Sequence, residues 1–441
     1  MLLQGAASAH DGCWPLSEAE KNGTAHNLSA EEICKQIAAA PQKLTATISG
    51  ITFDSDYDNG SLGSIVAGAN SNTFDATTFN EPGTIGARRY WFRFRMTGAA
   101  GRTVTINISH PDSPRPWYRF DNGAWLQMNT TQAPTTSRIV LAVPAGNTVT
   151  EVAFFSPYGC EETLNAVETI MQGRSDMTME VIGQSTQGRD IHMVTVNDTR
   201  FPDSQKQRIW VHTRAHAGEV TSTHSMIGLM QQLAEDSPTG ERLRRYGIWH
   251  IVPQLNVDGI YMGMTRWTTT GNDLERMYCP PGTPGVQPTE PEAAAVKAQV
   301  DRFMATDNPI KIALNLHSTV GQNWTDSFFF NHQPGSNGVT AAYTQYQRDY
   351  IEALRVASTT FDDRNPQTSN LADCIFIESY FFDNWRGAVM AMTHEGHYAT
   401  RWYDGAYMTD ADYREVGGGM ARAAISFLDF PELPTDLWLL H

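Results

Sequence analysis

Three side chains that commonly bind transition metals stand next to apolar segments of this 441-residue chain. His216 and Glu219 lie three residues apart with Gly218 between them, and His317 directly follows an apolar run. A His and a Glu at this spacing can point at one ion where a strand turns into a helix, and glycine permits the tight backbone required. Two His and one Glu leave the fourth position of a catalytic zinc for water. We therefore predict one zinc ion per chain.

A fourth candidate, Glu395, follows another apolar run and is flanked by His394 and His397. A carboxylate beside a zinc-bound water can take its proton, because zinc lowers the pKa of that water to about 7. We predict that Glu395 is the general base. His394 and His397 remain rival ligands, and a fourth protein ligand would close the site into a structural one. The ligand set also suits metals other than zinc.

The metal-binding candidates lie in a region where apolar segments alternate with helical ones. The predicted strands are residues 209–212, 248–252, 310–316 and 389–393, and two predicted helices are residues 223–234 and 290–304. This alternation predicts an α/β fold with a largely parallel sheet flanked by helices. Ligands of such sheets gather at the carboxyl ends of the strands, where the candidate residues stand.

The length and the strand pattern indicate more than one domain. A chain of 441 residues exceeds the ~100–200 residues of one typical core. Residues 44–158 alternate Thr, Val, Ile, Phe and Tyr with polar residues, which predicts a small antiparallel β-sandwich. We place the catalytic domain at residues 159–433, an N-terminal extension at 1–43 and a C-terminal tail at 434–441.

Charge and composition exclude several partners. The formal net charge is −16 and the basic residues form no run, so the sequence predicts no nucleic-acid partner. No segment approaches the ~20 apolar residues of a membrane-spanning helix. The five cysteines are widely spaced and indicate no disulfide framework; at most Cys13 and Cys34 pair. We expect a soluble, cytoplasmic protein, or a secreted or periplasmic one if a signal was removed. The oligomeric state stays open.

The order of the motifs resembles the M14 zinc carboxypeptidases, particularly their cytosolic carboxypeptidase-like branch. That family reads HxxE, NPDG, G-x-D-x-N-R, a strand-end His and T-x-E. The corresponding segments here are His216-Ala217-Gly218-Glu219, Asn256-Val257-Asp258-Gly259, Gly271-Asn272-Asp273-Leu274-Glu275-Arg276, Leu316-His317-Ser318 and Thr393-His394-Glu395. The resemblance covers about residues 205 to 400, and the all-β segment resembles the sandwich domain of that branch. It implies the mixed, mostly parallel twisted sheet of a zinc carboxypeptidase, flanked by helices, and an enzyme that acts on the C-terminus of a peptide or protein.

The resemblance also implies roles for three residues outside the metal cluster. Arg276 takes the place of the arginine that binds the terminal carboxylate of the substrate, which suits the bidentate geometry of a guanidinium. Arg266 takes the place of the arginine that polarises the scissile carbonyl and stabilises its oxyanion. Tyr380 is the candidate for a mobile tyrosine that contacts the terminal carboxylate.

Two residues depart from the family pattern. Val257 replaces Pro in a turn that Asp258-Gly259 still supports. Glu275 replaces Asn, and an ionised carboxylate there would repel a substrate carboxylate. Either an arginine neutralises Glu275, or the preferred substrate has no free C-terminus, or Glu275 positions a cationic group of the substrate.

Three functions therefore stay open. The first is a metallocarboxypeptidase that hydrolyses a C-terminal peptide bond or a side-chain glutamyl amide, and the branch raises glutamate removal as a possibility. The second keeps the zinc chemistry but acts on cell-wall peptides or other amides away from a C-terminus. The third is a catalytically silent peptide-binding module, which would have lost Glu395 or a metal ligand.

Overall fold

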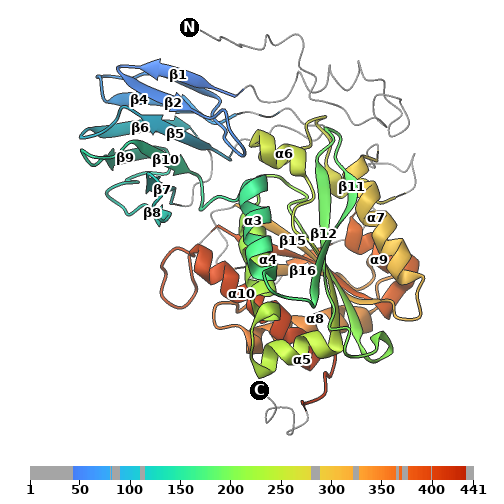
Figure 1. Ribbon diagram of the computed structural model, residues 1–441. Coiled ribbons are helices and arrows are strands. Elements are labelled where there is room, and N and C mark those ends of the chain that lie inside the picture. Colours follow the sequence, from blue (N-terminus) through green and yellow to red (C-terminus); the bar gives the residue numbers. More distant parts are fainter. Residues whose placement is uncertain are drawn as a thin grey trace.

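The computed structural model describes residues 43–79, 81, 90–109, 115–279, 289–320, 327–363, 367–369, 376–398 and 400–433. The predicted C-terminal tail lies outside these residues, as do Cys13, Cys34 and all of the N-terminal extension except Lys43. Figure 1 shows a β-rich part formed by an N-terminal stretch of the chain that ends at Ala153, beside a larger part with a central sheet and helices.

Among the described residues, ten short strands form the N-terminal part. They are β1 (Thr45–Ile48), β2 (Ile51–Asp54), β3 (Ser64–Ala67), β4 (Thr73–Thr77), β5 (Arg93–Thr97), β6 (Thr103–Ser109), β7 (Trp117–Phe120), β8 (Leu126–Gln127), β9 (Arg138–Ala142) and β10 (Val149–Ala153). The two sheets have the orders β1-β2-β5-β10-β7-β8 and β3-β4-β6-β9. Residues of both sheets share one buried core, as expected of a sandwich. The strand pairs are antiparallel except β4 with β6, which the alternating pattern could not predict.

The larger part is built on an eight-stranded sheet. Its strands are β11 (Met177–Gln184), β12 (Asp190–Val196), β13 (Gln207–Thr213), β14 (Gly247–Val252), β15 (Ile310–Thr319), β16 (Phe328–His332), β17 (Gln367–Ser369) and β18 (Met390–His397). Their order is β11-β12-β14-β13-β15-β18-β16-β17. The pairs β14–β13, β13–β15, β15–β18 and β16–β17 are parallel, and the other pairs are antiparallel. Central strands such as β14 are buried on both faces, which is why they read as continuous apolar runs.

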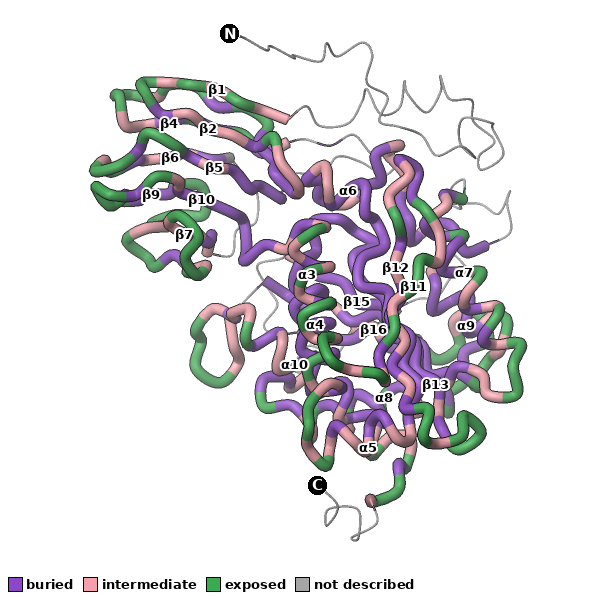
Figure 2. Tube along the Cα trace, viewed as in Figure 1, coloured by how far each residue is buried: buried purple, intermediate pink, exposed green. Residues whose placement is uncertain are grey.

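Helices cover both faces of this sheet. They are α3 (Cys160–Met171), α4 (Thr221–Ala234), α5 (Pro238–Tyr246), α6 (Val257–Met262), α7 (Pro291–Met304), α8 (Ala341–Ala357), α9 (Ile377–Trp385) and α10 (Asp410–Phe427). Apolar residues of α4, α8 and α10 pack with the sheet in one core, and those of α7 and α9 pack in another. Figure 2 shows the buried residues concentrated along the strands between these layers. The prediction of a mostly parallel sheet with flanking helices is confirmed.

Two expectations about the whole chain have outcomes in the structure. Cys279 is disulfide-bonded, which corrects the expectation that at most Cys13 and Cys34 pair, whereas Cys160 has a free thiol. Spacing along the chain does not report which cysteines the fold brings together. Among the described residues, every helix is too short or too polar to cross a bilayer.

Candidate active site

The three predicted metal ligands converge in one buried cluster. Nδ1 of His216, the carboxylate of Glu219 and Nδ1 of His317 all lie within 4.8 Å of one another. The two Nδ1 atoms are 3.0 Å apart, and the two oxygens of Glu219 lie 2.8 Å from His216 Nδ1 and 2.7 Å from His317 Nδ1. Each of the three residues is at most 5% exposed. In the described parts of the chain, this is the group that could hold a metal ion.

The chemistry of these donors fits a zinc ion. Two neutral imidazole nitrogens and one carboxylate facing a common point are a usual zinc ligand set. Although burial opposes ionisation, His216 and then His317 hold the pKa of Glu219 well below its ordinary value. The cluster therefore presents an ionised carboxylate to a cation. Zinc would be held by His216, Glu219 and His317.

The register of two parallel strands sets His317 beside Glu395. β15 and β18 pair His317 with Glu395 and Asn315 with Thr393. The side chains of residues two apart in a strand share a face, so all four lie on the same side of the sheet. The sequence placed His317 and Glu395 just after strands, whereas both belong to the last residues of their strands.

The rival ligands His394 and His397 do not belong to the described metal-binding group. His394 faces the opposite side of β18 from Glu395, because successive residues of a strand alternate in direction. The ring centroid of His394 lies 5.0 Å from that of Phe329 and 6.5 Å from that of Phe361, and burial lowers the pKa of His394 to about 3. The structure thus favours an open site with three protein ligands.

Asp273, to which the sequence reasoning gave no role, links the metal cluster to Arg266. Asp273 Oδ1 lies 3.0 Å from Nε2 of His216, and Asp273 Oδ2 accepts hydrogen bonds from Nε and Nη2 of Arg266 at 3.1 and 2.7 Å. An acceptor on the second ring nitrogen orients a metal-ligating His. Asp273 is fully buried, so one carboxylate fixes both a ligand and an arginine. Its signal in the sequence was the third position of the G-x-D-x-N-R motif.

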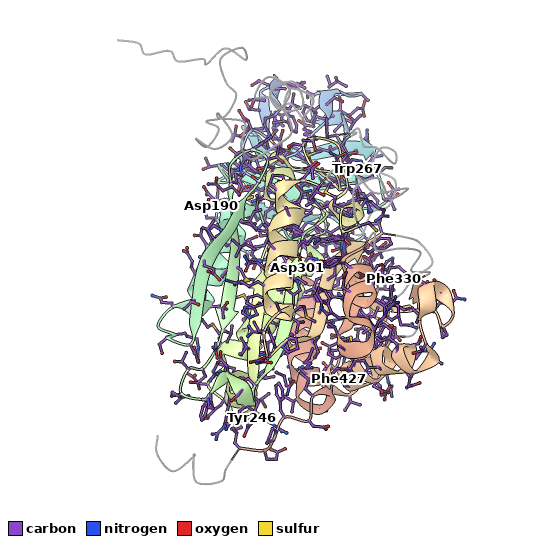
Figure 3. The ribbon with its side chains drawn as sticks, turned by 90° about the vertical axis from the view of Figure 1, so that its right-hand side faces the viewer. Asp190, Tyr246, Trp267, Asp301, Phe330 and Phe427 are labelled. Atoms are coloured by element: carbon purple, nitrogen blue, oxygen red, sulfur yellow. The ribbon has the colours of Figure 1, made fainter. Side chains whose placement is uncertain are left out.

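A cavity of about 240 Å³ opens beside the metal cluster. Its lining residues are His216, Arg266, Glu275, Arg276, His317, Phe330, Phe376, Glu378, Thr393 and Glu395. Phe330 is labelled in Figure 3, which views the molecule from the side of α7. The structure therefore brings Arg266, Arg276, Glu275 and Glu395 to the same cavity as the two metal-binding histidines.

Glu395 lies in this cavity with a partly buried carboxylate. Burial, and then the charge of Glu219, raises the pKa of Glu395 to about 8. Its Oε2 atom is buried and has no hydrogen-bond partner within the described structure. A carboxylate in this setting accepts a proton more readily than an exposed one.

Arg276 and Glu275 enter the cavity from a short 3-10 turn, Leu274–Arg276. The guanidinium of Arg276 lies over the ring of Phe376, 4.4 Å from its centroid. Glu275 Oε2 accepts a hydrogen bond from Nδ2 of Asn315 at 3.1 Å, and Glu275 Oε1 lies 3.4 Å from Nε2 of His317. Among the described residues, the partners of the Glu275 carboxylate are thus an amide and a histidine, and no arginine neutralises it.

The structure does not bring Tyr380 into the cavity. Tyr380 lies in α9, and its hydroxyl donates a hydrogen bond of 2.5 Å to Asp301 Oδ1 of α7, a residue labelled in Figure 3. Its ring also lies under Nζ of Lys297, 4.6 Å from the centroid. Two residues earlier in the same helix, Glu378 faces the cavity instead. Residues two apart in a helix point in different directions, so Tyr380 turns away.

Glu378 is a cavity residue that the sequence reasoning missed. It is buried, and its Oε1 accepts a hydrogen bond from Thr393 Oγ1 at 2.8 Å, whereas no described group hydrogen-bonds to its Oε2. Burial, and then the charge of Glu275, raises the pKa of Glu378 to about 7. The available signal was a single acid in the mostly apolar segment Ile377–Phe382. Burial of an unpaired acid costs free energy, so its presence there indicates a functional role.

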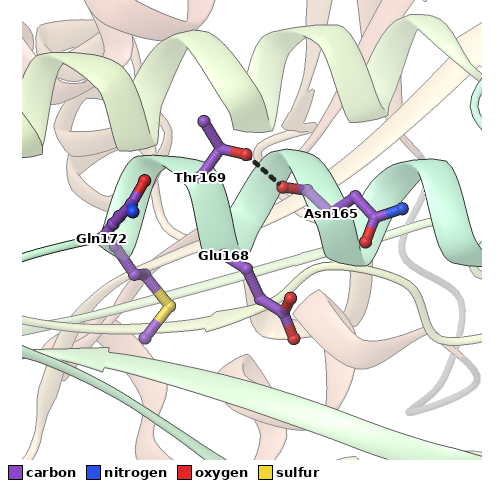
Figure 4. Close-up of a pocket in the computed structure, with 5 residues that line it drawn as sticks. Asn165, Glu168, Thr169 and Gln172 are labelled. Carbon is purple, nitrogen blue, oxygen red and sulfur yellow. Dashed lines mark hydrogen bonds between the residues drawn. The ribbon is translucent and has the colours of Figure 1, made fainter.

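A second depression lies on the surface of α3, away from the metal cluster. Its volume is about 590 Å³, and Figure 4 shows its lining residues Asn165, Glu168, Thr169, Met171 and Gln172. Thr169 donates a hydrogen bond from Oγ1 to the backbone oxygen of Asn165 at 2.7 Å, as is usual within a helix. These residues show no arrangement suited to catalysis.

Comparisons with known proteins agree with this site. The family model "Zinc carboxypeptidase", Peptidase_M14, matches residues 163–379. Human cytosolic carboxypeptidase 6 is 24% identical over 296 residues, which cover 61% of this chain and 58% of the relative. The match to mouse cytosolic carboxypeptidase 6 covers 54% of that protein. The chain thus spans little more than half the length of these relatives.

Two solved structures share the fold. The metallo-carboxypeptidase from Burkholderia cenocepacia has a TM-score of 0.71 at 20% identity, over 86% of this chain and 99% of that one. The same values describe the metallo-carboxypeptidase from Pseudomonas aeruginosa in complex with (2-guanidinoethylmercapto)succinic acid. The residues that match the family model include the intact His-Glu-His set. The chain therefore belongs to the M14 zinc carboxypeptidase family and is distantly related to the cytosolic carboxypeptidases.

Proposed function

We propose that this protein is a metallocarboxypeptidase that removes the last residue of a peptide. The observation that carries the proposal is one cavity of about 240 Å³ that joins the metal cluster, Glu395 and two arginines. When bound to His216, Glu219 and His317, zinc would supply Lewis acidity and an activated water.

Two residues of the chain have roles at the scissile bond. Glu395 takes a proton from the attacking water and returns one to the leaving amine, because it pairs with His317 in the β15–β18 register and lines the same cavity. Arg266 stabilises the negative charge that develops on the carbonyl oxygen. Asp273 holds its guanidinium so that Nη1 lies 3.3 Å from Nδ1 of His216. Asp273 therefore keeps the Arg266 guanidinium at the edge of the cavity, next to the metal cluster.

Arg276 accounts for a preference for chain ends. Its guanidinium faces the cavity, and no carboxylate of the described residues forms an ion pair with it. A guanidinium in this setting can bind a terminal carboxylate through two parallel hydrogen bonds. This favours exopeptidase activity over hydrolysis of amides away from a C-terminus. The presence of Glu395 and all three metal ligands disfavours a silent binding module.

The two further acids of the cavity favour a cationic residue at the released position. Glu275 and Glu378 line the cavity next to Arg276, and both are almost fully buried. A released glutamate would place a third carboxylate against them, whereas lysine or arginine would neutralise one. The Pseudomonas aeruginosa enzyme was solved with a molecule that combines a guanidine with carboxylates, which are the same two chemical groups.

Peptides that differ in their last residue test this function. Peptides ending in Lys, Arg, Leu or Glu, and a Lys peptide with an amidated C-terminus, are incubated with the protein, with chelator, and with chelator followed by zinc. We expect mass spectrometry to show single-residue release, fastest for Lys or Arg, which chelator stops and zinc restores. Cleavage of the amidated peptide, or of muropeptides alone, would support the amidase instead. Zinc binding with no cleavage of any substrate would support the silent module.

Changing Glu378 to Gln is expected to reduce the preference for basic residues. The variant keeps the size of the side chain and removes its charge, so kcat/KM for Lys and Arg peptides should fall roughly 10- to 100-fold relative to the Leu peptide, the usual value of a charge-assisted hydrogen bond. The control is Glu352→Gln, because Glu352 lies on the exposed side of α8. An unchanged ratio of Lys to Leu hydrolysis would show that Glu378 does not read the substrate.

A further inference from the structure

Glu81, a buried residue of the N-terminal β part, contacts the loop that carries Arg266. Glu81 lies between β4 and β5 along the chain and is fully buried. Its Oε1 accepts a hydrogen bond from the backbone N–H of Arg266 at 2.6 Å, and its Oε2 accepts one from the N–H of Thr265 at 3.1 Å. One side chain thus binds two successive backbone groups that are about 185 residues away in sequence.

The segment held by Glu81 also contacts the metal-binding turn. The backbone oxygen of Thr265 accepts a hydrogen bond from the N–H of Gly218 at 2.7 Å, and Thr265 Oγ1 accepts one from the N–H of Trp91 at 3.2 Å. A Cβ atom at Gly218 would lie 2.9 Å from that oxygen, so the turn requires glycine for this approach. Thr265 is therefore fixed between the β part and the turn that holds His216 and Glu219.

The loop around Arg266 has no regular backbone pairing of its own. It follows α6, which ends at Met262 and is capped by Gly263 with a φ of 73°, and it precedes the 3-10 turn that begins at Leu274. Two N–H groups of such a loop need acceptors when they are buried, and a carboxylate can satisfy both. Burial raises the pKa of Glu81 to about 8 despite these bonds, so the placement of an ionisable group here has a cost in stability.

We infer that Glu81 is a positioning residue for catalysis, because it holds the backbone of Arg266 and thereby sets its guanidinium beside His216. The β part is then a component of the active site. The inference rests on the proposed function, in which Arg266 stabilises the developing oxyanion. A misplacement of about 1 Å at such a group can reduce the rate roughly 100-fold.

The test compares Glu81→Ala with Asn59→Gly in the full-length, zinc-loaded protein. Asn59 also lies in the β part and is fully buried, and its Nδ2 donates to the backbone oxygen of Ile260 at 3.1 Å, away from Arg266. Glycine is chosen because Asn59 has a φ of 64°. We expect Glu81→Ala to lower kcat on the best peptide roughly 10- to 100-fold with little change in KM, and Asn59→Gly to lower it less than threefold.

A double-mutant cycle with Arg266→Ala separates positioning from general support. If Glu81 acts through Arg266, Glu81→Ala should reduce kcat by less than twofold in the Arg266→Ala background, measured at high enzyme concentration. An equal loss in both backgrounds, or a loss of bound zinc in Glu81→Ala, would overturn the inference, since the influence would then act through folding or the metal turn. Wild-type kcat in Glu81→Ala would also overturn it.

Amide hydrogen exchange provides a readout that does not depend on activity. Exchange at Thr265 and Arg266 should be faster in Glu81→Ala than in the wild type and in Asn59→Gly, with unchanged zinc content. Unchanged exchange at these two residues would overturn the inference about Glu81. A wild-type protein that cleaved no peptide would overturn the proposed function, and the exchange measurement would still test Glu81. If Glu81→Ala fails to fold, Glu81→Gln replaces it in every arm, because its amide nitrogen cannot accept one of the two backbone hydrogen bonds.

Discussion

Glu395→Gln is expected to lower kcat on peptides on the order of 10³-fold while one zinc ion per chain remains bound. Glutamine has nearly the same shape as glutamate, but it cannot accept the proton of the attacking water. Glu395 lies opposite His317 in the β15–β18 register, so the strand pairing holds the variant side chain in the same place. It is also outside the His-Glu-His group, so metal binding should survive.

The measurements are kcat by quantified release of the terminal residue and zinc content by elemental analysis. Glu352→Gln serves as the control for loss of one carboxylate, because Glu352 is exposed on α8 and pairs with Arg355 there. It should retain wild-type kcat. Full turnover by zinc-loaded Glu395→Gln would mean that another group is the base, and Glu378 would be the next candidate because it lines the same cavity.

His317→Ala is expected to abolish stoichiometric zinc binding and to reduce peptide release to background. The substitution removes one of three donors, and it also leaves two buried carboxylates without the histidine between them. His317 Nδ1 lies 2.7 Å from Glu219 Oε2, and its Nε2 lies 3.4 Å from Glu275 Oε1. Removal of one partner of a buried ion pair usually costs roughly 3–5 kcal/mol, so the free energy of unfolding should fall as well.

His394→Ala is the matched control for this prediction. His394 is as deeply buried as His317 and lies one residue before Glu395, but it packs with Phe329 and Phe361 on the other face of β18. We expect it to lose stability and to keep its zinc. Zinc content and thermal unfolding are measured for both variants. If His394→Ala loses the metal and His317→Ala keeps it, the proposed ligand set is wrong.

The residues of the metal cluster were predictable because their signal is local. His317 ends an apolar run, and His216 and Glu219 stand in the turn that follows another. Runs of this kind are how strands buried on both faces read in a sequence. Parallel neighbours place their carboxyl ends at one edge of a sheet, so His317 and Glu395 could be expected together before their register was known. The order of the motifs then indicated the family.

The sequence did not predict which side chains of α9 face the cavity. Tyr380 was a candidate from its distance to Glu395 along the chain, but a distance in sequence does not determine which side of a helix faces a cavity. The helix turns about 100° per residue, so Glu378 rather than Tyr380 points into the cavity beside the metal cluster. The partners of Glu275 were also unpredictable. Asn315 and His317 lie in β15, about 40 residues further along the chain, and only the folding of the sheet brings them next to Glu275.

The sequence by itself determined the class of fold, the metal ligands and the candidate base, since these depend on local patterns of apolar and polar residues. The tertiary structure alone decided what surrounds them. Glu378 enters the cavity, Asp273 joins His216 to Arg266, and Glu81 binds the Arg266 loop from the segment between β4 and β5. The physical reason is the same in each case: such contacts join groups far apart in the chain, and only packing brings them within hydrogen-bond distance.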